Sequence, residues 1–253
     1  MGVGRGHDGA VRPTIVLLHG FTQTGVSWRA VADALGERYR ALAPDLRGHG
    51  SAAALRPVTI EACVADVVAS APERFSLAGY SMGGRLALRV ALAYPERVER
   101  LVLVGTTPGI ADNLERAARR EADDALASEL EEGLDIETFA RRWARQPIHK
   151  GQPPEVAAAA HDDRLRNQPA GLAAALRGLG QGAGDPLWSR LGEVRMPATV
   201  IAGERDGTYA KLAERMVARM PCARTLVVPG TGHAVQLEAP AIVAAALTDG
   251  QDA

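Results

Sequence analysis

The motif G-Y-S-M-G at residues 79–83, followed by Gly84, constrains the fold of this 253-residue chain more than any other feature. An apolar run, RFSLAG, precedes it, and a helical pattern, MGGRLALRVALA, follows it. A serine between a buried strand and a helix requires a sharp turn, and side chains at the flanking positions would clash there, hence the glycines. The motif therefore predicts a strand over 74–79, a turn at Ser81 and a helix over 82–93.

Further apolar runs alternate with helical patterns along the rest of the chain. Continuous apolar runs are typical of parallel strands that are buried on both faces. Their alternation with helices predicts an α/β protein with a mostly parallel sheet and helices on both faces. The expected strands cover 14–20, 39–45, 100–105, 197–203 and 224–230, and the expected helices cover 26–35, 59–70, 208–219 and 240–250.

The pattern changes over residues 110–180, which are rich in Ala, Glu and Arg and contain almost no strand-like run. This stretch predicts several short helices, divided by Pro147, Pro153, Pro154 and Pro169. We expect it to form a helical cap inserted into the sheet domain. The predicted division is an α/β core over 1–107 and 186–253 and a cap over 108–185.

Composition excludes several classes of protein. Hydrophobic residues make up 47% of the chain, charged residues 23%, and the formal net charge is −1, so no global field favours nucleic acid or a membrane surface. No segment has the roughly 20 apolar residues of a membrane span, and the N-terminus lacks a signal-peptide core, so we expect a cytoplasmic protein. Cys63 and Cys222 lack metal-ligand spacing and are interpreted as buried small hydrophobes, and we expect no metal or cofactor.

Ser81 needs a partner that takes its proton, because a serine hydroxyl is a weak nucleophile at neutral pH. After this kind of turn, the partners follow along the chain in the order acid, then histidine. Asp206 and His233 each come just after one of the last two predicted strands. Parallel strands end at one edge of a sheet, so we expect Ser81, Asp206 and His233 to meet there as a catalytic triad. Glu204 is the competing acid.

The loop after the first strand, His19-Gly20-Phe21, is expected to complete the site. In proteins with this turn, that loop supplies one donor of an oxyanion hole, and the residue after the nucleophile supplies the other. We therefore expect the N–H groups of Phe21 and Met82 to hold an oxygen anion. His19 is interpreted as a hydrogen-bonding residue that shapes the loop, and residues 45–51 as a structural loop with tight glycine turns.

Arginines are the candidate residues for binding an anionic substrate. Arg85 lies in the first turn of the helix after Ser81, where a cation opposes the helix dipole, and this favours a role facing the site. The alternative is a side chain that reaches solvent or Glu115. Guanidinium groups bind carboxylates through paired hydrogen bonds, so two cap arginines directed at Ser81 would select a polyanion. The candidates in the cap include Arg116, Arg119, Arg120, Arg141, Arg142, Arg145, Arg164 and Arg166.

Several segments together resemble the 2-succinyl-6-hydroxy-2,4-cyclohexadiene-1-carboxylate synthases of menaquinone biosynthesis, a family of the α/β-hydrolase superfamily. The similarity runs from about residue 14 to 240. HGF and G-x-S-x-G are common to the superfamily. The discriminating pieces are GYSMGGR, the cap segment WARQPI, and the R-x-x-N-x-x-x-G-L-A run that begins at Arg164. One departure is that Gly207-Thr208-Tyr209 follow AGERD, where the family usually has a lysine and then a phenylalanine.

The resemblance implies a lyase of the α/β-hydrolase fold that acts on a small polycarboxylate. Its reaction eliminates pyruvate from 2-succinyl-5-enolpyruvyl-6-hydroxy-3-cyclohexene-1-carboxylate, after a proton beside the succinyl ketone is removed. The resemblance places the triad on Ser81, Asp206 and His233. It places carboxylate binding on Arg85, Arg119 and Arg164, with Tyr80 and Trp143 lining the pocket.

Three other functions must be weighed against the same residues. A carboxylesterase or lactone hydrolase would use the triad through a covalent acyl-serine. A non-catalytic binding module is disfavoured by the complete triad, and a dehalogenase is disfavoured because Ser81, not an aspartate, occupies the turn.

Overall fold

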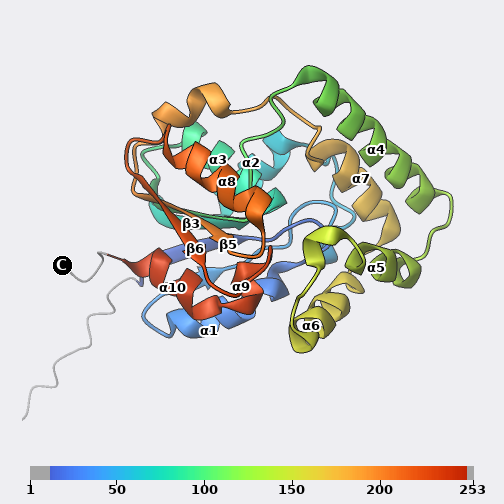
Figure 1. Ribbon diagram of the computed structural model, residues 1–253, viewed down its shortest axis with the longest axis horizontal. Helices are drawn as coiled ribbons and strands as arrows, with labels where there is room; N and C mark the ends of the chain where they lie inside the picture. The colour runs from blue at the N-terminus through green and yellow to red at the C-terminus, as the bar shows by residue number, and fades with distance from the viewer. Residues whose placement is uncertain (1–11, 250–253) are drawn as a thin grey trace, which may run out of the picture.

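A sheet of six parallel strands forms the centre of the computed structural model, which describes residues 12–249 (Figure 1). The strands are β1 (Thr14–Leu18), β2 (Arg40–Leu42), β3 (Phe75–Tyr80), β4 (Val98–Val104), β5 (Ala198–Gly203) and β6 (Ala223–Val228). Their order across the sheet is β2-β1-β3-β4-β5-β6, and each neighbouring pair is parallel. The predicted α/β class with a parallel sheet is confirmed.

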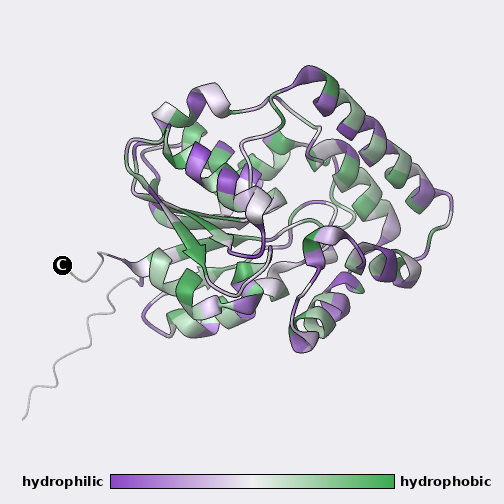
Figure 2. Cartoon of the chain, in the orientation of Figure 1, coloured by the Kyte–Doolittle hydropathy of each residue, from purple (hydrophilic) through white to green (hydrophobic). Residues whose placement is uncertain are grey.

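The inner strands are buried because helices cover both faces of the sheet. Every residue of β1, β3 and β5 is buried, as their continuous apolar runs predict. One face is covered by α2 (Ile60–Ser70), α3 (Met82–Ala93) and α8 (Gly207–Val217), and the other by α1 (Arg29–Leu35), α9 (Val235–Glu238) and α10 (Pro240–Thr248). Figure 2 shows the hydrophobic colouring concentrated on the strands and the helix sides that meet them.

Three local expectations were wrong in detail. The strand expected over 39–45 is shorter, because β2 ends at Leu42. Beyond it Asp45 lies outside the sheet and accepts hydrogen bonds from the N–H groups of Gly25 and Ser51. The short helix α9 was not predicted, because four residues are too few to show a helical period. Cys63 is buried as expected, but Cys222 is exposed, because it lies in the turn that leads to the edge strand β6.

Four helices lie between β4 and β5, within the predicted cap over 108–185. They are α4 (Asn113–Glu131), α5 (Ile136–Ala144), α6 (Pro154–Arg164) and α7 (Pro169–Leu179). Prolines begin α6 and α7, where the missing N–H leaves no hydrogen bond unmade. The cap has a small core of its own around Phe139 and Leu172, and Figure 1 shows its helices to one side of the sheet.

The division into core and cap stays a prediction, and its ends at 1–11 and 250–253 lie outside the described residues. Within residues 12–249, no helix is both long and apolar enough to cross a lipid bilayer.

Candidate active site

Ser81 occupies a strained turn between β3 and α3. Its φ of 50° and ψ of −110° lie in a region that residues other than glycine rarely adopt. Close packing leaves no room for side chains around it, because a Cβ at Gly79 would lie 2.3 Å from the carbonyl oxygen of Gly83, and one at Gly83 would lie 2.1 Å from that of Leu18. The glycines of the motif therefore allow the backbone to present Ser81 at the carboxyl edge of the sheet.

Asp206 and His233 are joined by a direct hydrogen bond of 2.6 Å between Oδ2 and Nδ1. Asp206 follows β5 and is the N-cap residue of α8, and His233 follows β6. The competing acid, Glu204, accepts a hydrogen bond from the backbone N–H of Gly230 and is exposed. The acid that orients the imidazole is therefore Asp206.

The second imidazole nitrogen of His233 is free. His233 is 2% exposed, and its Nε2 has no hydrogen-bond partner among the described residues. The ring packs against Tyr209, at 4.5 Å between centroids, and against Tyr80, the neighbour of Ser81, at 5.2 Å. The structure thus forms the Asp206–His233 hydrogen bond and places His233 beside the serine turn, but it forms no hydrogen bond between Ser81 and His233.

The loop after β1 and the first residue of α3 flank Ser81. Phe21, Ser81 and Met82 all line one cavity. The roles of Phe21 and Met82 as oxyanion donors stay a prediction. His19 is fully buried; its Nδ1 lies 2.9 Å from the carbonyl oxygen of Gly20, and its Nε2 accepts a hydrogen bond from the N–H of Leu46. Both ring nitrogens therefore hold the loop in place.

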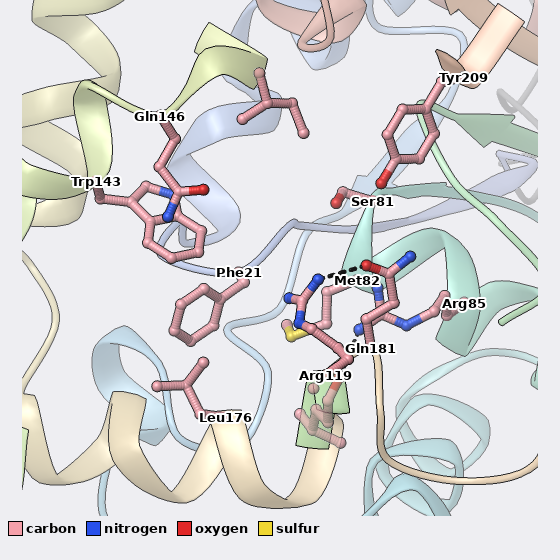
Figure 3. Close-up of a pocket in the computed structure, with 13 residues that line it drawn as sticks. Phe21, Ser81, Met82, Arg85, Arg119, Trp143, Gln146, Leu176, Gln181 and Tyr209 are labelled. Carbon is pink, nitrogen blue, oxygen red and sulfur yellow. Dashed lines mark hydrogen bonds between the residues drawn. The ribbon is translucent and has the colours of Figure 1, made fainter. Parts of the chain in front are cut away.

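The cavity at Ser81 has an apolar side and a polar side. Phe21 and Trp143 pack edge to face at 5.0 Å on the apolar side. Arg85, Arg119 and Tyr209 lie on the polar side, nearer Ser81, as Figure 3 shows. The full lining is Phe21, Ser81, Met82, Arg85, Arg119, Trp143, Gln146, Ile148, Leu176, Leu179, Gly180, Gln181 and Tyr209.

Arg85 and Arg119 bring two positive charges to this cavity. Arg85 donates a 2.6 Å hydrogen bond to the carbonyl oxygen of Leu179 and does not pair with Glu115, the alternative partner. Burial lowers the pKa of Arg85 to about 10, and repulsion from Arg119 acts in the same direction. Arg119 forms a 2.9 Å ion pair with Asp123 and donates a 2.6 Å hydrogen bond to the side-chain oxygen of Gln181. An anion in the cavity would relieve the repulsion between the two guanidinium groups.

Arg164 and Tyr80 do not line this cavity, although the resemblance groups them with the substrate-binding residues. Arg164 ends α6 and is 2% exposed, and Tyr80 ends β3 and is 3% exposed. Burial lowers the pKa of Arg164 and raises that of Tyr80, and each group acts electrostatically on the other. The predicted set of three arginines is thus divided into a pair at the cavity and a single buried cation beside Tyr80.

Sequence reasoning missed several residues that line the cavity, although signals for them were present. Gln146 and Ile148 lie within the cap segment WARQPI, and Gln181 follows the R-x-x-N run in GLGQG. Tyr209 lies in the three-residue departure after AGERD, on the first turn of α8. Within residues 12–249, no group of three His, Cys, Asp or Glu side chains is placed to hold a metal ion.

Comparison with known proteins agrees with this geometry. Residues 15–246 match the family described as "Alpha/beta hydrolase family". The chain belongs to the alpha/beta hydrolase family. It is an enzyme of that superfamily, with a strained serine at the turn after the third strand and a histidine–aspartate pair at the same edge of the sheet.

Individual members of the family are similar over nearly their whole length. A Bacillus subtilis (strain 168) protein, provisionally named 2-succinyl-6-hydroxy-2,4-cyclohexadiene-1-carboxylate synthase, is 36% identical over 89% of this chain and 85% of its own. A Nitrosomonas europaea protein named pimeloyl-[acyl-carrier protein] methyl ester esterase is 31% identical over 90% of this chain and 91% of its own. The structure of MenH from S. aureus has a TM-score of 0.86 at 27% identity and covers 96% of both chains. The similarity to the synthases is confirmed.

Proposed function

We propose that this enzyme is a carbon–oxygen lyase of menaquinone biosynthesis that forms 2-succinyl-6-hydroxy-2,4-cyclohexadiene-1-carboxylate. Its substrate, 2-succinyl-5-enolpyruvyl-6-hydroxy-3-cyclohexene-1-carboxylate, carries three carboxylates and loses pyruvate. The observation that carries the proposal is the pair Arg85 and Arg119 in the cavity that Ser81 borders. Two cations beside a nucleophile suit a polycarboxylate better than a neutral ester.

The reaction begins with removal of the proton on the carbon beside the succinyl ketone. Ser81 Oγ takes this proton while His233 Nε2 takes the hydroxyl proton, and Asp206 stabilises the resulting imidazolium. The electron pair of the C–H bond forms an enolate and then shifts through the ring, so that the bond to the enolpyruvyl oxygen breaks. The leaving group takes up a proton and becomes pyruvate. No acyl-enzyme forms, and no water is consumed.

Catalysis in this scheme depends on two groups of residues. A positioned base contributes typically about 10²–10⁴-fold to the rate. The enolate oxygen lies between the N–H groups of Phe21 and Met82, and loss of one such donor typically lowers kcat by about 10²–10³-fold. The Ser81–His233 hydrogen bond forms when substrate is bound, because catalytic hydrogen bonds often tighten only in the substrate complex.

A serine esterase is the second candidate, and the similarity to the Nitrosomonas europaea esterase favours it. In that reaction Ser81 would attack a carbonyl carbon and form an acyl-enzyme, which water would then hydrolyse. The two candidates differ in their use of the arginines. The lyase needs Arg85 and Arg119 to bind the carboxylates of its substrate. A small neutral ester has no carboxylate for these two arginines to bind.

The test is pyruvate release from the enolpyruvyl precursor, followed continuously, beside hydrolysis of a p-nitrophenyl ester. We expect the wild type to release pyruvate and the variants Arg85→Ala and Arg119→Ala to lose about 10- to 100-fold in kcat/KM, since each hydrogen bond to a charged group is worth ~1.5–3 kcal/mol. Arg141→Ala is the matched control, because Arg141 is an exposed cap arginine paired with Glu137. Ester hydrolysis without pyruvate release, equal in all three variants, would favour the esterase.

A further inference from the structure

The hydroxyl of Tyr209 is a hydrogen-bond donor in the cavity that the proposed reaction does not use. Tyr209 lines the same cavity as Ser81, Arg85 and Arg119. Its backbone N–H forms a hydrogen bond, but its hydroxyl has no hydrogen-bond partner among the described residues. The segment Gly207-Thr208-Tyr209 departs from the family that the chain resembles, so the resemblance assigns this side chain no role.

Asp206 and His233 together fix the position of Tyr209. The backbone N–H of Tyr209 donates a 3.4 Å hydrogen bond to Oδ1 of Asp206, whose Oδ2 is bonded to His233. The aromatic ring packs on the imidazole of His233, at 4.5 Å between centroids, and against the apolar core. Figure 3 shows the ring directed from α8 toward Ser81, with the hydroxyl at the end that enters the cavity.

The hydroxyl of Tyr209 keeps its proton near neutral pH and can therefore donate. Burial raises the pKa of Tyr209 above the ordinary value of about 10. The charges of Arg85 and Arg119 act in the opposite direction, as expected of cations that share the cavity. A neutral donor offers an anion one more hydrogen bond without adding to the repulsion between the two guanidinium groups.

The two arginines leave room for a further donor, because part of each guanidinium is already engaged. Arg85 bonds the carbonyl oxygen of Leu179 through Nη2, and Arg119 bonds Asp123 through Nε and Gln181 through Nη1. An ionised carboxylate has about four lone-pair sites on its two oxygens, so it can accept hydrogen bonds from several donors at once. The hydroxyl of Tyr209 would complete the set of donors around such a group.

We propose that Tyr209 is a further substrate-binding residue, whose hydroxyl donates a hydrogen bond to the substrate carboxylate that Arg85 and Arg119 hold. This inference rests on the proposed polycarboxylate substrate. It makes the hydroxyl a determinant of specificity, because a substrate that lacks this carboxylate leaves the donor unpaired. The proton transfer remains with Ser81 and His233.

Tyr209→Phe tests the hydroxyl alone, because it removes one oxygen atom and keeps the ring against His233. We expect KM for pyruvate release to rise about 10- to 100-fold with a smaller change in kcat, since a hydrogen bond to a charged group is lost. The melting temperature should not fall, because the hydroxyl has no partner among the described residues. An unchanged KM, or a fall in kcat alone, would overturn the proposal.

Tyr39→Phe is the matched control for the loss of a tyrosine hydroxyl. Tyr39 packs in the apolar core on the other face of the sheet and does not line the cavity. We therefore expect its KM for pyruvate release to equal that of the wild type. A rise in KM as large as that of Tyr209→Phe would show that the effect does not arise in the cavity and would overturn the proposal.

Arg119→Gln shows whether the hydroxyl and the arginine bind the same carboxylate. The glutamine loses the positive charge but keeps an N–H donor for the buried Asp123. In this background we expect Tyr209→Phe to raise KM by a smaller factor than in the wild type, because the carboxylate is no longer held beside the hydroxyl. Equal factors in the two backgrounds would overturn the proposal, since residues without a shared partner act independently.

Calorimetric titration with succinate, a simple dicarboxylate, separates failure of this inference from failure of the proposed function. Weaker succinate binding in Tyr209→Phe than in the wild type supports the inference, even if the wild type releases no pyruvate and the lyase assignment falls. Pyruvate release with the same KM and the same succinate affinity in both proteins overturns the inference and leaves the lyase assignment intact. A wild type that neither releases pyruvate nor binds succinate overturns both.

Discussion

The carboxylate of Asp163 in the cap accepts two hydrogen bonds from Thr24, one from its backbone N–H at 3.0 Å and one from its hydroxyl. Thr24 lies three residues after Phe21, in the loop that follows β1. Asn167 adds a second link, because its side-chain amide donates a 2.9 Å hydrogen bond to the carbonyl oxygen of Thr22. The last turn of α6 and the residues just after it thus hold the loop that is expected to supply one oxyanion donor.

Removal of the Asp163 carboxylate should weaken both the fold and catalysis. Asp163→Ala leaves the buried donors of Thr24 unpaired, and we expect a loss of about 1–3 kcal/mol in the free energy of unfolding. We also expect kcat for pyruvate release to fall more than KM rises, because the loop that carries Phe21 is less well held. Denaturant unfolding and steady-state kinetics measure the two effects. Asp162→Ala, at the exposed neighbouring position, is the control. Equal effects in both variants would show that the hydrogen bonds between Asp163 and Thr24 do not hold the loop.

Glu238 joins the two loops that carry the acid and the histidine. Its Oε2 accepts a 2.9 Å hydrogen bond from the N–H of Gly232, next to His233, and a 2.7 Å hydrogen bond from Arg205, next to Asp206. The side chain of Glu238 is 2% exposed. It is therefore a positioning residue for the Asp206–His233 pair.

We expect Glu238→Ala to lower kcat about 10- to 100-fold with little change in KM, because the imidazole loses its fixed orientation while the anion-binding residues stay in place. Glu238→Gln keeps an acceptor oxygen and should retain most of the activity. Glu204→Ala is the control, because the Glu204 side chain is exposed and bonds only Gly230 among these loops. Loss of activity that follows a rise in KM, in place of a fall in kcat, would exclude a positioning role.

His49 should make the fold sensitive to acid. It is fully buried beneath Phe21, with ring centroids 5.7 Å apart, and burial lowers its pKa to about 3, with the nearby His19 acting in the same direction. Between about pH 3 and pH 6.5 the unfolded chain therefore binds a proton at His49 that the folded chain does not bind. The contribution of the neutral His49 to the free energy of unfolding is therefore fully present above about pH 6.5, and it is lost as the pH is lowered toward 3.

We expect this one histidine to contribute a slope of about 1.4 kcal/mol per pH unit to the free energy of unfolding. Urea unfolding at several pH values between 4 and 7 measures it, with His49→Gln as the comparison. The variant should be less stable at pH 7 and should show a shallower pH dependence. The same slope in both proteins would mean that His49 is not the titrating group.

The parts of the fold that follow from local pattern could be predicted from the sequence. Buried parallel strands are apolar throughout, so β3 and β5 were located within one residue of their observed ends. The strained turn at Ser81 could be predicted from the glycines that flank it, because the backbone segments approach too closely there for a Cβ. Edge strand β2 was predicted too long, because its end is set by the contacts of Asp45 and not by hydropathy.

The arrangement of the site could be predicted only in part. The order of serine, acid and histidine along parallel strands predicted that Asp206 and His233 would meet, and they do. The position of each arginine depends on how the cap helices pack, which no local pattern encodes. Arg85 and Arg164 therefore lie in different surroundings, although the resemblance implied the same role for both.

The measurement that tests the central claim most directly is pyruvate release by Ser81→Ala, together with its equilibrium affinity for the enolpyruvyl precursor. If Ser81 and His233 remove the proton while the arginines hold the carboxylates, kcat should fall at least about 10²–10⁴-fold and the dissociation constant should change little. His233→Ala should show the same pattern, because the two residues act as one unit. Near-normal turnover by Ser81→Ala would contradict the account.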